Sequence, residues 1–251
     1  MSETMTIDDY LAQGGVLTNP SNAPPRYRGE LLRLMATFVD SELAGSAGFA
    51  EVINDAPSLK ARIAASRIVL EKTDHAERVL DLMGTFGADT ARYAVHHPWA
   101  ARLARDAEIG AARHGADRRL SVFHYPLQGW IDAVVMNVLM GRAVGIQLQE
   151  FSRLSYAPLA EVFREIAPRE ARHAELGEEG LARIVATEGG REAAQRSVDF
   201  WRPRVAASFG REDSPRFDTL RRFGLRRRTN HEQVTAWMAE MAARLPAFGL
   251  A

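Results

Sequence analysis

The chain has 251 residues, of which 46% are hydrophobic and 25% charged, an ordinary composition for a soluble globular protein with a sizeable core. Its 32 basic and 32 acidic side chains balance, so the overall charge gives no reason to expect binding to nucleic acid or to an anionic membrane. The absence of cysteine excludes disulfides, thiolate metal sites and cysteine-ligated iron–sulfur clusters.

The N-terminus and the short motifs exclude further classes of protein. Residues 1–13 carry acidic side chains rather than the basic and then apolar segments of a signal peptide. We expect no apolar run long enough to span a bilayer. The chain lacks a Walker loop, a dinucleotide fingerprint and a nucleophile elbow. We therefore expect a cytoplasmic protein of one domain, residues 1–251, without flavin, haem or an iron–sulfur cluster of its own.

Hydrophobic residues recur at helical spacing along most of the chain, and no stretch alternates convincingly with a period of two. Residues 1–25, which include a loop rich in proline and asparagine, are expected to be irregular. The predicted helices cover residues 27–44, 58–83, 126–154, 158–186, 192–209 and 230–245, with a shorter helix after Pro98. This pattern predicts an all-α fold, a four-helix bundle with additional C-terminal helices.

Local signals refine three of these helices. Gly45 is expected to end the first long helix. Pro168 removes a backbone hydrogen bond from the fourth and is expected to kink it. Asn230, with Gln233 three residues later, is a candidate capping pair for the last helix.

Two motifs far apart in the sequence indicate the chemistry of the interior. Glu170 and His173 form a Glu-x-x-His motif, and Lys72 and His75 have the same spacing with lysine in the glutamate position. Residues at i and i+3 lie on one face of a helix. Ferritin-like bundles build di-iron or di-manganese centres from two Glu-x-x-His helices and one carboxylate from each of two other helices. Here one of the four carboxylates has become a cation.

Glu42 and Asp132 are candidates for the two remaining carboxylates, because both are embedded in apolar sequence. A buried carboxylate needs a cation, a metal or several hydrogen-bond donors as a partner. Each acid alone is read more simply as part of a solvated helix face. Together with His75, Glu170 and His173, they match the ligand set of a ferritin-like metal centre at every position except that of Lys72.

From about residue 27 to residue 250, the sequence resembles the catalytic subunit of phenylacetyl-CoA epoxidase, a ferritin-like oxygenase component of aerobic phenylacetate degradation. The segments that carry the resemblance are Tyr27-Arg28, Ser41-Glu42 with Gly45, Asp74-His75, Phe123-His124-Tyr125-Pro126 with Trp130 and Asp132, Ser155-Tyr156-Ala157-Pro158, residues 170–173, Phe200-Trp201, Phe209-Gly210 and Ser214-Pro215.

The resemblance implies a ferritin-like fold with iron-ligand positions at Glu42, His75, Asp132, Glu170 and His173. It also implies oxygen-dependent hydroxylation or epoxidation of an aromatic or acyl-CoA substrate. The implied partners are a paralogous ferritin-like subunit, in an oligomer, and a separate reductase that supplies electrons.

Two positions depart from the family pattern, since Lys72 replaces the expected glutamate and Pro168 interrupts a helix that is continuous in the family. Lys72 is one of only two lysines in the chain. An ammonium about 4 Å from a divalent iron would cost roughly 8 kcal/mol at an effective dielectric constant near 20. We therefore expect the ammonium to occupy the space of one metal and to pair with Glu42, Asp132 or Glu170.

Three arrangements of this site are compatible with the sequence. In the first, the site is metal-free and Lys72 bridges carboxylates. In the second, one metal remains at the side of Asp132, Glu170 and His173. In the third, burial lowers the pKa of Lys72, and the neutral amine ligates a metal or acts as a catalytic nucleophile or base. Glu71 is a candidate substitute ligand, although a surface position suits it better. We favour a metal-free or metal-poor site over an intact di-iron centre.

The remaining candidates have weaker patterns. His96, His97 and His124 have no partner at ligand spacing, and Tyr125 is expected to pack at a helix start rather than to carry a radical. Arginines between residues 221 and 228 suit the phosphates of coenzyme A, although an exposed turn is the simpler reading. Two functions follow: a modified oxygenase of an aromatic or acyl-CoA substrate, or a metal-free scaffold protein that binds a substrate or a catalytic paralogue.

Overall fold

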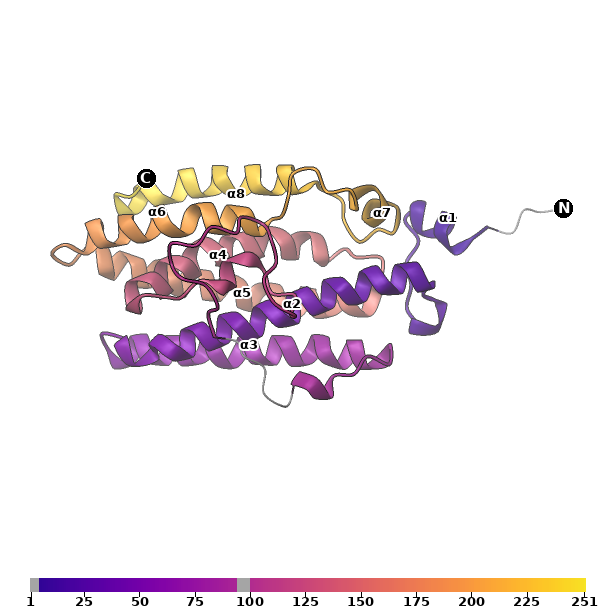
Figure 1. Ribbon diagram of the computed structural model, residues 1–251, viewed down its shortest axis with the longest axis horizontal. Helices are drawn as coiled ribbons and strands as arrows, with labels where there is room; N and C mark the ends of the chain where they lie inside the picture. Colours follow the sequence, from indigo (N-terminus) through magenta and orange to yellow (C-terminus); the bar gives the residue numbers. More distant parts are fainter. Residues whose placement is uncertain (1–4, 94–99) are drawn as a thin grey trace.

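The computed structural model describes residues 5–93 and 100–251 (Figure 1). Its α-helices are α1 (Ile7–Ala12), α2 (Pro25–Val52), α3 (Leu59–Thr85), α4 (Gly129–Phe151), α5 (Ala157–Val185), α6 (Gly190–Ser208), α7 (Phe217–Arg222) and α8 (Asn230–Arg244). Short 3-10 helices are η1 (Pro20–Asn22), η2 (Ile53–Asp55), η3 (Ala91–Tyr93), η4 (Ser121–His124) and η5 (Leu245–Phe248). The described residues form no β-strand beyond an isolated bridge between Leu17 and Tyr156. The predicted all-α fold is confirmed.

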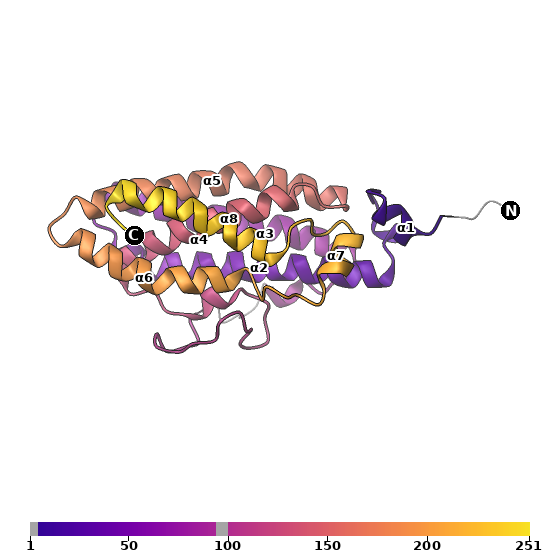
Figure 2. The same cartoon turned by 90° about the horizontal axis from the view of Figure 1, so that it is seen from above.

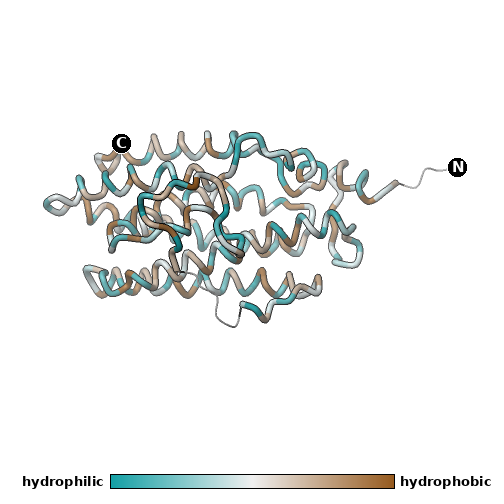
Figure 3. The backbone as a smooth tube through the Cα atoms, viewed as in Figure 1, coloured by the Kyte–Doolittle hydropathy of each residue, from teal (hydrophilic) through white to brown (hydrophobic). Residues whose placement is uncertain are grey.

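The bundle consists of two antiparallel helix pairs, α2 with α3 and α4 with α5 (Figures 1 and 2). Contacts between α3 and α5 and between α2 and α4 close the four-helix arrangement, and α6 and α8 cover the other side of α4. Hydrophobic and hydrophilic positions alternate around the turns of the outer helices α3 and α8 (Figure 3). Such amphipathic helices bury one face and leave the other in water. This is the ferritin-like bundle with additional C-terminal helices that the sequence predicts.

The central helix, α4, is apolar on nearly all sides. It is long and apolar enough to span a membrane, so the expectation that no segment has that length is wrong. However, 72% of its most apolar window is buried inside the protein, because α2, α5, α6 and α8 surround it. A helix that is hydrophobic all round suits the centre of a large bundle as well as a membrane.

Two helix boundaries differ from the predicted ones. α2 continues through Gly45 to Val52, so Gly45 does not end the helix. A Cβ atom at Gly45 would lie 3.3 Å from the Phe123 ring and 3.6 Å from Cδ of Lys72, so this glycine provides room for packing. The segment expected to be irregular, residues 1–25, contains α1, which is capped by the side chain of Thr6.

The other corrections concern the middle and the end of the chain. Residues 100–120 form turns instead of a helix, and Gly110 and Gly115 there have positive φ angles of 53° and 93° that an α-helix cannot accommodate. The last helix is capped by a box of Thr229 and Glu232 rather than by Asn230 and Gln233.

The α4–α5 contact brings the backbones of the two helices close together. A Cβ atom at Gly177 would lie only 2.7 Å from Nδ2 of Asn137, and one at Gly141 would lie 3.0 Å from Cβ of Ala174. The amide of Asn137 donates a hydrogen bond to the backbone oxygen of His173 at 2.8 Å. α5 runs through Pro168 without a break, so the proline costs one backbone bond but does not end the helix.

Candidate metal centre

Five of the six predicted site residues meet in the interior of the bundle. α2 supplies Glu42, α3 supplies Lys72 and His75, and α5 supplies Glu170 and His173. Nζ of Lys72 donates to Oε1 of Glu42 at 3.2 Å and to Oε1 of Glu170 at 2.9 Å. Both carboxylates are buried, and Lys72 is only 8% exposed. The ammonium therefore points inward and bridges the two acids.

The two histidines face the same carboxylates through their Nδ1 atoms. Nδ1 of His75 lies 3.2 Å from Oε2 of Glu42 and 3.1 Å from Oε1 of Glu170, and Nδ1 of His173 lies 3.2 Å from the latter oxygen. Nε2 of His173 lies 2.7 Å from Oε2 of Glu71. His173 thus contacts a carboxylate with each ring nitrogen, Glu170 through Nδ1 and Glu71 through Nε2.

The charges of the cluster determine its protonation. Burial alone would lower the pKa of Lys72, but the carboxylates of Glu170 and Glu42 outweigh burial and raise it above its usual value. Burial would raise the pKa of Glu170, but Lys72 and the hydrogen bonds from the two imidazoles hold it well below its usual range. The pKa of His75 is raised in spite of burial, by its hydrogen bonds to Glu170 and Glu42. These contacts favour a protonated Lys72 over the arrangement in which burial makes it a neutral amine.

The sixth predicted residue, Asp132, lies apart from this cluster. Its carboxylate pairs with Arg105 and accepts hydrogen bonds from the backbone of Gln128 at 2.9 Å and from Oγ of Ser197 at 2.6 Å. Asp132 is in the first turn of α4, whereas Asn137, more than a turn further along, contacts the backbone of His173. The structure pairs Lys72 with the carboxylates of α2 and α5 and not with Asp132.

Comparison with known proteins places the chain in a family. A family model described as "Phenylacetic acid catabolic protein" matches residues 5–251. The chain belongs to this family. It is also 24% identical over 236 residues to one of the subunits of the 1,2-phenylacetyl-CoA epoxidase of Escherichia coli (strain K12), covering 92% of this chain and 71% of that protein. The relationship supports assignment to an oxygenase-component family.

The residues of this cluster do not suit a two-metal centre. Within the part of the chain that the structure describes, only Glu42 and Glu170 pair a carboxylate with the Lys72 ammonium. Two divalent ions there would add four positive charges beside that ammonium. A single ion needs fewer ligands, and ligand atoms of Glu42, His75 and Glu170 lie within 4.8 Å of one another. These three residues could hold a single cation only if the Lys72 side chain moved away.

A cavity of about 420 Å³ lies beside the cluster, and Glu42, Lys72 and Glu170 form part of its wall. Aromatic and aliphatic residues form much of the rest, including Phe38, Phe123, Met136, Met140, Trp201 and Phe209. The wall also contains arginines, Arg33, Arg113, Arg119, Arg211, Arg216 and Arg226. Of the arginine cluster singled out in the sequence, only Arg226 reaches this wall.

The other histidine and tyrosine candidates lie outside the cluster or outside the described residues. The hydroxyl of Tyr125 accepts a hydrogen bond from the backbone of Ile109, in agreement with a packing role. His124 is fully buried in η4, and its ring nitrogens have no hydrogen-bond partner among the described residues. His96 and His97 lie outside the described residues.

Sequence reasoning missed some residues of the cavity and the cluster. Glu71, expected at the surface, instead holds the outer nitrogen of His173, although its side chain is 28% exposed. Asn137 could have been found, because it is the only polar residue between Asp132 and Arg142 in α4. The contribution of Arg33 and Arg113 to the cavity has no local signal, since it depends on how distant segments fold together.

Proposed function

We propose that the protein is a component of a phenylacetyl-CoA epoxidase-like oxygenase in which Lys72 has taken the place of a metal ion. The observation that carries the proposal is the pair of contacts from Nζ of Lys72 to Glu42 and Glu170. A divalent ion held by the same carboxylates would lie within a few ångströms of the ammonium. The ammonium itself supplies the positive charge that the buried carboxylates require.

The roles of the site residues follow from this arrangement. Glu42, His75 and Glu170 are the set able to accept one cation when Lys72 is removed, and His173 orients Glu170 through its Nδ1 atom. Asp132 is engaged with Arg105 and serves the fold. With its pKa raised, Lys72 is a counter-ion and not a nucleophile or base.

The proposed ligand is an aromatic or acyl-CoA-type molecule bound in the 420 Å³ cavity. The apolar part of the wall suits an aromatic ring, and guanidinium groups such as those of Arg211 and Arg226 suit phosphate. We further propose a cytoplasmic location, a paralogous ferritin-like partner and a separate reductase. The name of the Escherichia coli relative, which describes one of the subunits of an epoxidase, supports an assembly of several chains.

The same contacts of Lys72 are compatible with a second candidate, in which the chain binds a ligand or a catalytic paralogue without performing oxygen chemistry itself. The two candidates differ in metal content. If the chain activates oxygen at its own metal, wild-type protein must bind that metal. If Lys72 replaces the metal, wild-type protein must lack it, and removing the ammonium must create a binding site.

The experiment is elemental analysis of the wild type, Lys72→Glu and Lys60→Glu after growth with added iron and manganese. Lys60 is exposed, so its substitution makes the same change in net charge away from the cluster. We expect substoichiometric metal in the wild type and in Lys60→Glu, and about one ion per chain in Lys72→Glu, because a carboxylate then joins Glu42, His75 and Glu170. Stoichiometric metal in the wild type, or unchanged metal in Lys72→Glu, would contradict the proposal.

A further inference from the structure

Three side chains of the cavity wall have a buried polar atom without a hydrogen-bond partner among the described residues, those of Ser121, Trp201 and Arg216. The guanidinium of Arg216 still pairs with Glu30 through its Nη2 atom. Ser121 in η4 is 4% exposed and Trp201 in α6 is fully buried, and both residues line the cavity. Oγ of Ser121 and Nε1 of Trp201 have no hydrogen-bond partner within the part of the chain that the structure describes. The two groups belong to one region of the wall, because η4 packs directly against α6.

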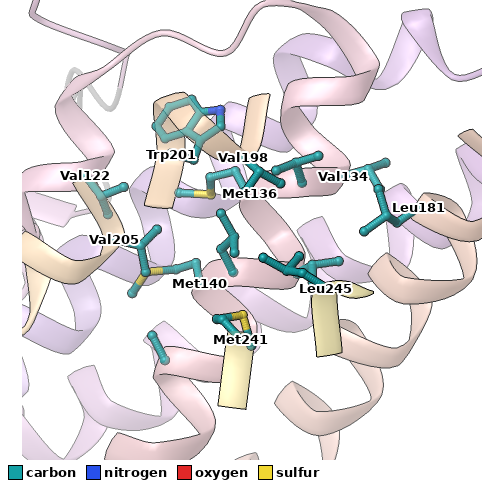
Figure 4. Packing of buried hydrophobic residues seen from close by; sticks show 14 of the residues in the cluster. Val122, Val134, Met136, Met140, Leu181, Val198, Trp201, Val205, Met241 and Leu245 are labelled. Atoms are coloured by element: carbon teal, nitrogen blue, oxygen red, sulfur yellow. The ribbon is translucent and has the colours of Figure 1, made fainter. Parts of the chain in front are cut away.

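The surroundings of these groups are apolar. Figure 4 shows Trp201 beside Val198 and Met136, in the cluster of buried hydrophobic residues that also contains Val122 and Met140. A buried donor without an acceptor costs free energy, and nearly all buried polar groups in proteins are paired. Trp237 is paired, since its Nε1 donates to the backbone oxygen of Leu139 at 3.0 Å. Nε1 of Trp201 has no such acceptor among the described residues.

The hydrogen-bonding chemistry of the two groups limits which ligand atom can bind to them. An indole nitrogen is only a donor, and a serine hydroxyl donates as well as accepts, so together they suit an oxygen with two lone pairs. The guanidinium of Arg105 lies over the indole, 5.6 Å from its ring centre, and pairs with the carboxylate of Asp132. An uncharged carbonyl oxygen therefore suits this position better than a carboxylate.

We propose that Ser121 and Trp201 form a subsite that binds the carbonyl oxygen of an aromatic acyl thioester. The inference rests on the proposed substrate class and deepens it, because it distinguishes thioesters from aromatic molecules without a carbonyl group. The acyl carbonyl is fixed between η4 and α6, and the aromatic ring lies in the apolar part of the cavity. Both residues position the substrate and take no part in bond making.

The test compares two probes, phenylacetyl-CoA and its 2-phenylethyl thioether analogue, which keeps the ring and the coenzyme but lacks the carbonyl oxygen. Binding is measured by calorimetry for the wild type, Ser121→Ala and Trp201→Phe. Each variant removes one donor and should weaken phenylacetyl-CoA about 3- to 10-fold, the usual worth of one hydrogen bond. Neither variant should weaken the thioether.

Two further variants serve as controls. Ser208 lines the same cavity, but its hydroxyl already donates to the backbone of Val205 at 2.6 Å, so Ser208→Ala should bind both probes like the wild type. Trp237→Phe removes a satisfied indole donor and should lower thermal stability, whereas Trp201→Phe removes an unsatisfied one and should lower it less. Ser121→Ala makes a small change and keeps the test valid if Trp201→Phe folds poorly.

The outcomes separate this subsite from the proposed function. Equal binding of both probes by the wild type, or equal weakening of both probes in the variants, would overturn the carbonyl subsite and leave the substrate class intact. Failure of the wild type to bind either probe would overturn the substrate class and the subsite together.

Discussion

Replacing Lys72 by methionine keeps most of the side-chain volume but removes the charge between Glu42 and Glu170. At the observed separations of 2.9 and 3.2 Å, each attraction is worth about 5 to 6 kcal/mol at an effective dielectric constant of 20, before desolvation is subtracted. Desolvation of the three ions offsets most of this, and breaking a buried pair typically leaves a loss of about 3 to 5 kcal/mol. For a chain of this length that loss lowers the melting temperature by about 10 °C.

The assay is urea and thermal denaturation of Lys72→Met beside Lys60→Met, the exposed matched control. The pH dependence gives an independent check. Glu170 has a lowered pKa in the wild type, so its stabilisation is present above its ordinary pKa and is lost as pH falls through the lowered value. In the variant the unpaired carboxylates instead become easier to bury as they protonate. The difference in unfolding free energy between the wild type and Lys72→Met should therefore shrink in acid. A difference below about 1 kcal/mol at pH 7 would refute the buried ion pair.

Three other changes test the rest of the structure. Burial, with help from the Arg119 charge, lowers the pKa of His124 to about 4, so the stability that its neutral ring contributes is present above about pH 6.5 and is lost as pH falls toward 4. The stability lost over this pH range amounts to at most about 3 kcal/mol, less the effect of solvent screening. His124→Leu should therefore flatten the stability–pH curve between about pH 4 and 6.5. An unchanged slope there would show that His124 does not cause this loss. Asp132→Asn should destabilise the fold by about 2 kcal/mol without changing the metal content of Lys72→Glu protein, and a loss of metal would restore Asp132 as a ligand. Gly177→Ala should cost about 1 to 3 kcal/mol because its Cβ would meet Asn137, whereas Gly145→Ala, which meets nothing within 4 Å, should stabilise α4 by roughly 0.5 to 1 kcal/mol; melting curves in the opposite order would contradict the α4–α5 packing.

The helices were predictable because their periodicity is a local property repeated over many turns. The inward position of Lys72 was predictable for a related reason, since its spacing from His75 matches that of Glu170 from His173. Gly45 shows the limit of such reasoning. A glycine that ends a helix and a glycine that makes room for a neighbouring ring have the same local sequence, and only the Phe123 contact distinguishes them.

Asp132 and Glu71 were misplaced because their partners come from elsewhere in the chain. Arg105, which pairs with Asp132, comes from a segment of turns without any periodic pattern. Glu71 was expected at the surface rather than as a substitute ligand, but its carboxylate contacts His173. This contact depends on how closely α3 and α5 pack. Hydrogen-bond partners between distant segments follow from tertiary packing, and a single sequence contains no record of them.

The enclosure of α4 affects how the protein must be synthesised. A segment so apolar emerges from the ribosome after α2 and α3 but before α6 and α8, which cover its remaining surface. During that interval the nascent chain exposes a strip resembling a membrane anchor, and such surfaces promote aggregation and chaperone binding. Truncations that remove α8 should therefore yield insoluble or mis-sorted protein even though the charged cluster of α2, α3 and α5 is complete.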